Sequence, residues 1–93
     1  MKVRRVKNVD GTSLVGYVTT TFDRLVQVFG RPCIEEPGEL DKVNILWKLE
    51  IQKKTITIYD YKEKVPPTVG EYRWHIGGYV NGVDKIVGEM INS

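Results

Sequence analysis

The sequence has very few of the residues that build disulfides and metal centres. It contains one cysteine, Cys33, and one histidine, His75, among 93 residues. A lone cysteine excludes an intramolecular disulfide and fits a reducing cytosol. One cysteine and one histidine cannot supply the ligands of a known zinc site, so we expect no metal and no cofactor. Cys33 is interpreted as a partly buried apolar side chain.

Long apolar runs and a strong charge bias are also missing. No run approaches the roughly 20 residues of a membrane-spanning helix. The first ten residues, M-K-V-R-R-V-K-N-V-D, lack the apolar segment of a signal peptide. The formal net charge of +2 is too small to indicate binding to nucleic acid or to a membrane. We therefore expect a soluble cytoplasmic chain, with residues 1–93 forming a single domain.

The segment from Val43 to Tyr61 has the pattern of a β-hairpin. Apolar side chains occupy every second position of V-N-I-L-W-K-L-E-I, and T-I-T-I-Y-D-Y is rich in β-branched and aromatic residues. Side chains alternate across a strand, so each strand buries one face and exposes the other. The polar residues 52–54 form a short turn, although no Asn-Gly or Asp-Gly pair assigns its type.

The rest of the chain divides into two helices and three strands. Residues 2–9 and 14–19 are expected to be strands, which the turn signal at 10–12 would join as a hairpin. A short helix begins at the capping residue Thr20 and ends at Gly30. An acidic loop over 33–42 and a proline-containing loop over 62–70 flank the hairpin. A strand over 71–76 ends at Gly77 and Gly78, and a second amphipathic helix follows to the C-terminus.

These elements predict an α+β fold with the order β-β-α-β-β-β-α. An antiparallel sheet of four to five strands would carry both amphipathic helices on one face. Trp47 and Trp74 fall on the face that the helices cover, so they are expected to be core residues. Asp60 falls on the same side, where we expect it either to reach solvent at the strand end or to pair with a basic residue.

The opposite face is the first candidate binding site. Tyrosine side chains next to arginine and histidine can stack on a planar ligand and hold its anionic groups. Tyrosine and threonine are also frequent on any solvent-exposed sheet face, and aromatic side chains equally suit a homodimer interface. The site residues expected on this face are Tyr59, Tyr61, Arg73 and His75.

The second candidate is the sequence W-H-I-G-G-Y-V-N-G. Glycines allow a backbone to approach a phosphate, and a helix N-terminus presents free amides to anions. This interpretation adds Gly77, Gly78 and the expected helix cap Asn81 to the ligand-binding residues. The segment is not a known phosphate-binding fingerprint, and a tight strand-to-helix turn explains it equally well.

Two family resemblances extend this interpretation. The sequence T-F-D-R-L-V-Q-V-F-G-R-P followed by a tryptophan-bearing hairpin resembles the helix and hairpin unit of the BamE-like and β-lactamase-inhibitor-protein-like folds. The lipoprotein cysteine of the BamE group is absent, which argues against an outer-membrane role. The blocks T-T-T-F-D-R-L-V-Q-V-F-G-R-P, T-I-T-I-Y-D-Y-K and W-H-I-G-G look like small uncharacterised proteins of bacteriophages and prophages.

The phage resemblance implies an accessory protein in the cytoplasm of the host cell that binds a component of host defence. That component would be a nucleotide signal, a cyclic one included, or a host protein. No catalytic residue can be carried over, so a non-enzymatic binder is the leading expectation. A small nucleotide-degrading enzyme that uses His75 and a structural protein of the virion are the alternatives. Small chains often build such pockets between subunits, so a homo-oligomer is also expected.

Overall fold

The protein is described by a computed structural model, which covers residues 2–34 and 42–93. The acidic residues predicted to form a loop, Glu35, Glu36, Glu39 and Asp41, lie outside the described residues. The elements are β1 (Val3–Arg5), β2 (Ser13–Thr21), α1 (Phe22–Phe29), β3 (Leu46–Ile51), β4 (Lys54–Tyr59), β5 (Glu71–Gly78) and α2 (Val83–Ile91). The α+β class and the element order predicted from the sequence are therefore confirmed.

The sheet has five antiparallel strands in the order β1-β3-β4-β5-β2. The central hairpin is confirmed, since Leu46 pairs with Tyr59 and Ile51 pairs with Lys54. Its turn residues Gln52 and Lys53 have φ values of 54° and 64°. Positive φ at both central residues matches the type I′ turn that suits the twist of a two-residue hairpin.

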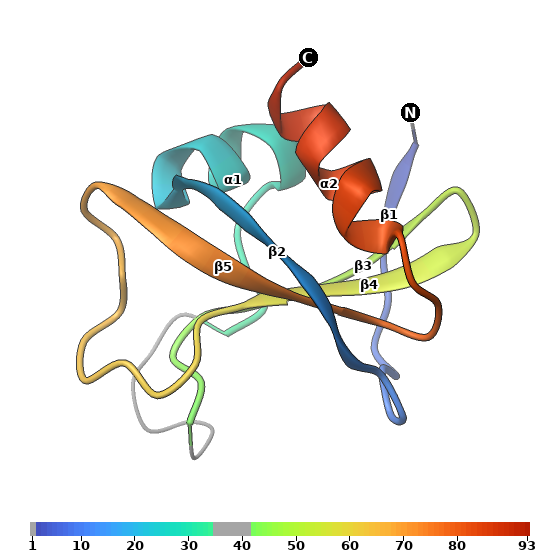
Figure 1. Cartoon of the computed structure of the whole chain (residues 1–93), viewed down its shortest axis with the longest axis horizontal. Coiled ribbons are helices and arrows are strands. Elements are labelled where there is room, and N and C mark those ends of the chain that lie inside the picture. The colour runs from blue at the N-terminus through green and yellow to red at the C-terminus, as the bar shows by residue number, and fades with distance from the viewer. Residues whose placement is uncertain (1, 35–41) are drawn as a thin grey trace.

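Both helices lie on one face of the sheet (Figure 1). The buried core lies between them and the sheet, and Trp47 and Trp74 are fully buried there, as expected. Their indole N–H groups donate to the carbonyl oxygens of Gly30 and Thr20. Trp47 therefore ties the C-terminal end of α1 to the sheet, and Trp74 bonds to β2 just before α1 begins. Both are buried in the core, which leaves neither free to contact a ligand.

The expected hairpin of β1 and β2 is wrong. β1 pairs with β3 at one edge of the sheet, and β2 pairs with β5 at the other. Residues 6–12 connect the two edges, and Figure 1 shows this connection on the side of the sheet opposite the helices. Lys48, which faces that side, donates from Nζ to the carbonyl oxygen of Lys7. The turn signal at Asp10-Gly11 therefore reverses the chain without pairing the strands beside it.

Three local expectations also need correction. The N-cap of α1 is Thr21, one residue later than expected, and its side chain accepts from the amide of Arg24. The strand does not end at Ile76 but continues through Gly77 to Gly78, its last residue. The cap of α2 is Gly82, whose φ is 97°, and Asn81 lies before it in the turn. Glycine adopts this left-handed conformation without steric cost.

Asp60 is fully buried and does not reach solvent, and no basic side chain within residues 2–34 and 42–93 pairs with it, contrary to expectation. Its Oδ1 accepts from the amides of Asn44 and Ile45 at 2.8 and 2.9 Å, and its Oδ2 accepts from Asn44 Nδ2 at 2.8 Å. Three donors compensate the desolvation of the carboxylate. Asp60 therefore fixes the chain entering β3 against the end of β4.

Candidate functional site

An aromatic cluster of Tyr17, Tyr59, Tyr61 and His75 occupies the sheet face opposite the helices. Tyr17 pairs with His75 in the sheet register, and Tyr59 pairs with His75 on the other side. Because cross-strand partners point to the same face, three neighbouring strands place these rings side by side. Tyr61 follows β4 directly and completes the cluster.

His75 is the centre of this cluster. Its ring centroid lies 5.4 Å from that of Tyr59 in a stacked geometry, 5.1 Å from that of Tyr17 edge-on, and 5.6 Å from that of Tyr61. These separations are within the range of favourable aromatic contacts. The four rings and Leu14 line a depression of about 400 Å³. Its volume is that of a small-molecule site.

Arg73 supplies positive charge beside the rings. Its guanidinium carbon lies 3.7 Å from the centroid of the Tyr17 ring, the closest cation–ring contact among the described residues. Lys62 lies 5.4 Å from the centroid of the Tyr61 ring. The depression therefore has a cation on two of its tyrosines, an arrangement that favours an anionic group on a bound ligand.

The electrostatic state of His75 follows from its surroundings. Burial lowers the pKa of His75, and the cation of Arg73 lowers it further. The main chain of Tyr59 opposes this lowering of the pKa, yet Nδ1 of His75 is buried and has no hydrogen-bond partner within the described residues. The imidazole is consequently neutral near pH 7. Its ring then serves as an uncharged stacking surface among the tyrosines.

Burial raises the pKa of Tyr59, which belongs to the cluster, and of Tyr72, which lies beside it. The pKa of Tyr59 is raised first by burial and then by the hydroxyls of Tyr17 and Tyr61. Burial also raises the pKa of Tyr72 to about 12. The Tyr72 hydroxyl donates to Glu63 Oε2 and accepts from the amide of Tyr61 at 3.3 Å. Tyr72 thus holds the main chain of Tyr61 in place from outside the cluster.

The structure brings together four of the seven residues that the sequence nominated. Tyr59, Tyr61 and His75 line the depression, and Arg73 lies over its fourth ring, Tyr17. Gly77 adjoins the cluster, since a Cβ there would lie 3.5 Å from Tyr59 Cε1.

Gly78 and Asn81 do not belong to this group. A Cβ on Gly78 would lie 2.8 Å from Val83 Cγ2, so this glycine permits the close packing of α2 on β5. Asn81 lies in the turn that follows. The two glycines therefore permit close packing on both faces of β5. The candidate site beside them, the aromatic cluster, is formed by side chains.

The sequence interpretation missed Tyr17 and Leu14. Both lie on β2. This strand was expected to pair with β1, but the two strands lie at opposite edges of the sheet. The alternation of β2 did carry a usable signal, because Tyr17 and Thr19 are exposed while Val18 between them packs against the core. Only the strand order shows that this exposed side of β2 adjoins His75.

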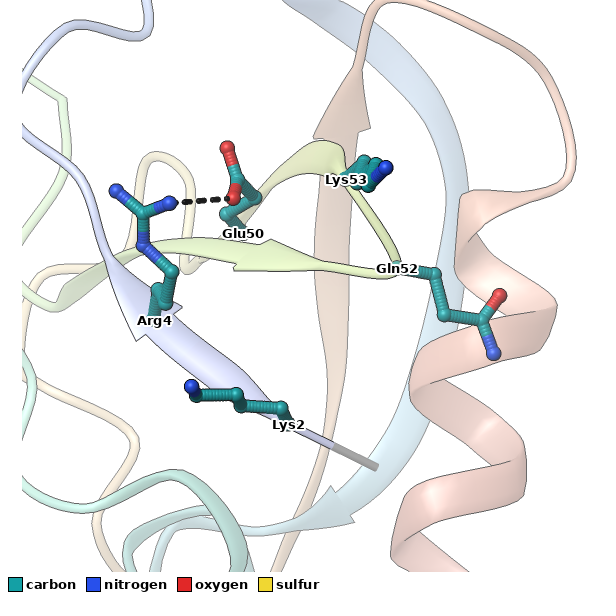
Figure 2. A pocket seen from close by; sticks show the side chains of 5 residues that line it. All are labelled: Lys2, Arg4, Glu50, Gln52 and Lys53. Carbon is teal, nitrogen blue, oxygen red and sulfur yellow. Dashed lines mark ion pairs between the residues drawn. The ribbon is translucent and has the colours of Figure 1, made fainter.

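A second depression, of about 330 Å³, lies at the far end of β3 and is lined by Lys2, Arg4, Glu50, Gln52 and Lys53. Figure 2 shows Arg4 turned toward Glu50, with which it forms an ion pair at 3.3 Å, while Gln52 extends away from both. The Arg4 side chain is 65% exposed, so the pair is well solvated and contributes little to stability.

Comparison of the chain with models of known protein families, with curated proteins and with solved structures finds no match.

Other classes of site are poorly represented in the described part of the chain. Residues 2–34 and 42–93 contain no group of three or more metal-ligating side chains. No helix among them is long and apolar enough to cross a membrane. Cys33 is exposed, contrary to the expectation of a partly buried filler, and its amide donates to the carbonyl oxygen of Leu46. The aromatic cluster is therefore the strongest candidate site.

Proposed function

We propose that this chain is a phage accessory protein that binds and sequesters a nucleotide signal of host defence at the aromatic cluster. The observation that carries the proposal is the ring of His75, surrounded by three tyrosines, with Arg73 directly over Tyr17. The phage origin rests on the resemblance of the three sequence blocks given above.

The two halves of a nucleotide match the two kinds of side chain at the cluster. A base has a π-face that stacks on tyrosine or imidazole, worth about 1–3 kcal/mol per base. A phosphate favours an arginine, whose planar guanidinium presents several donors. Tyr61 is 38% exposed and Tyr17 is 37% exposed, so both rings remain accessible to a ligand.

Binding without turnover fits this site better than catalysis. A histidine base is normally oriented by a carboxylate or a carbonyl that accepts from its second nitrogen. Nδ1 of His75 has no such partner among the described residues. The neighbouring carboxylate of Asp60 is fully buried and holds Asn44 and Ile45. The main chain of Tyr59 acts on the imidazole, so the case for binding rests on the stacked rings and on the structural role of Asp60.

The proposal is tested by calorimetry and thermal unfolding with a panel of linear mononucleotides, cyclic mononucleotides and cyclic dinucleotides. A ligand at 100 times its Kd stabilises the folded state by about 2.7 kcal/mol. His75→Ala should abolish this stabilisation. The matched control is Tyr79→Ala, because Tyr79 is also an exposed aromatic residue but contacts Asp10 instead of the cluster.

Two outcomes would contradict the proposal in different ways. Absence of stabilisation by every nucleotide would remove the nucleotide signal as the target. Recovery of an altered nucleotide, detected by mass spectrometry after the protein is denatured, would show turnover and favour the enzyme alternative. Binding with recovery of the intact nucleotide supports sequestration.

A host protein is the second candidate target, favoured by the loop between β4 and β5. Val65 and Val69 are 71% and 93% exposed on either side of Pro66 and Pro67. Exposed apolar side chains on a loop are typical of protein contacts. Affinity capture from infected cells with the unmodified chain and with a Val65→Ser/Val69→Ser variant tests this alternative. A partner retained by the first and lost by the second supports it.

A further inference from the structure

The two edges of the sheet differ in their protection against pairing with another strand. β1 forms one edge, has three residues and carries Arg4 and Arg5. β2 forms the other edge, has nine residues and carries neither a charge nor a proline. Short length and charged side chains are the usual devices that keep an edge strand from pairing. β1 therefore has both devices, and β2 has neither.

The outer side of β2 is available over its central part. The register of β2 with β5 shifts between Leu14 and Gly16 and is regular from Gly16 onward. At the end of β2, Thr20 is buried and Thr21 caps α1. None of the described strands pairs with the outer side of β2. Residues 16–19 thus present unpaired main-chain groups to solvent.

We propose that two copies of the chain pair through these β2 edges, antiparallel about a two-fold axis, and form one continuous sheet. A two-fold contact places the same strand opposite itself, so any charge on it would face a like charge or need a partner. β2 itself brings no charge to the axis, and the charged groups that lie on it, Arg73 over Tyr17 and Asp84 beside Gly16, are of opposite sign. The residues that would face one another, Tyr17, Val18 and Thr19, are of the types that form favourable cross-strand pairs.

The second copy also completes the aromatic cluster at its open side. The cross-strand row that passes through the cluster runs Leu46, Tyr59, His75 and Tyr17, and it ends at Tyr17 because β2 is the last strand. A strand added beside β2 extends this row by one position. The second copy therefore walls the depression on the side where it is exposed, and it brings the clusters of the two copies next to each other.

The experiment measures mass by sedimentation without any nucleotide, so its result is independent of ligand binding. The expected result is a concentration-dependent particle with twice the 10.7 kDa mass of the chain. Thr19→Lys places like charges across the axis and should raise the dimer Kd at least tenfold. Thr68→Lys, the same change on an exposed loop residue, should leave that Kd unchanged.

Hydrogen exchange on the unmodified chain provides a readout that does not depend on a variant folding. Outward amides within residues 16–19 should become more protected as protein concentration rises, while the β1 edge should not change. A monomer at every concentration, a dimer unaffected by Thr19→Lys, or exchange at 16–19 that is independent of concentration would each overturn the proposal. A dimer protected instead at β1 would do the same.

Discussion

Arg73 and Tyr17 form a stacked pair across the last two strands of the sheet, with the guanidinium carbon 3.7 Å from the ring centroid. The pair joins a cation at the cluster's edge to a ring that lines the depression. We predict that Arg73→Ala weakens nucleotide binding at least tenfold, because it removes both the charge and the stacked donor plane. Arg73→Lys should recover part of the loss.

The stability of the Arg73 variants distinguishes a binding role from a structural one. Arg73 is exposed, so Arg73→Ala should change the free energy of unfolding by only about 0.5–1 kcal/mol. Calorimetry gives the Kd and urea unfolding gives the stability of the same samples. A large loss of stability together with the loss of binding would make Arg73 a structural residue.

Acid should destabilise the fold through His75. Its folded-state pKa lies below the ordinary value of 6.5, so the unfolded chain binds the proton more readily. Stability therefore falls as the pH drops below about 6.5, and the loss ends once the pH is below the folded-state pKa. Urea unfolding between pH 7.5 and 5 measures this effect, which His75→Gln should remove.

The assignment of this acid effect is unambiguous because His75 is the only histidine in the chain. The proton resonances of its ring report the folded-state pKa directly. A midpoint at or above 6.5 would contradict both the burial of the ring and the expected direction of the pH dependence.

Loss of the Asp60 carboxylate should be costly. Asp60→Ala leaves the amides of Asn44 and Ile45 and the Asn44 side chain without their acceptor in a buried place. We expect a loss of about 3–5 kcal/mol in the free energy of unfolding. Glu63→Ala, which removes an exposed carboxylate nearby, should cost less than about 1 kcal/mol. Equal losses in the two variants would contradict the role assigned to Asp60.

Two glycines offer opposite tests of packing. A Cβ at Gly77 would lie 2.3 Å from Thr57 Oγ1, and Thr57 is buried, so Gly77→Ala should destabilise the fold by about 1–3 kcal/mol. Gly88 lies inside α2 with no atom within 4 Å of its Cβ position. Gly88→Ala should therefore stabilise the fold by about 0.5–1 kcal/mol.

A double variant checks the cause of the Gly77 effect. Thr57→Ala removes the Oγ1 atom that the new methyl group would meet, so Gly77→Ala should cost less in the Thr57→Ala background than in the unmodified chain. Additive losses, measured by urea unfolding, would assign the effect to the other neighbours of the new methyl group, Ser13 O and Tyr59 Cε1.

The sequence predicted those features that depend on side-chain periodicity. Alternation placed Trp47 and Trp74 on the buried face and Tyr59 and His75 on the other, because a strand has only two faces. The helical stripes predicted two helices over one face for the same reason. Family identity was beyond the reach of these patterns, and the phage resemblance stays a prediction.

Pairing partners and local capping were predicted less well because they depend on contacts between distant segments. The Asp10-Gly11 signal describes a local reversal, whereas the partner of β2 is set by the burial of Val18 beside Trp74. Asp60 was misread because its donors are main-chain amides, which leave no mark in the side-chain pattern. The type I′ turn uses Gln52 and Lys53 in place of the residues that normally identify it.

The connection over residues 6–12 also affects the order in which the strands can pair during synthesis. β1 must wait for β3, and β2 must wait for β5, so β2 is the strand that waits longest for its partner. Such long-range pairings slow folding, since loop closure precedes any gain from contacts. A nascent chain that stops before Glu71 would leave the uncharged β2 strand wholly without a partner. Premature termination in the loop after β4 should therefore yield fragments that aggregate. In the finished chain, only the main-chain groups on the outer side of β2 lack a partner strand.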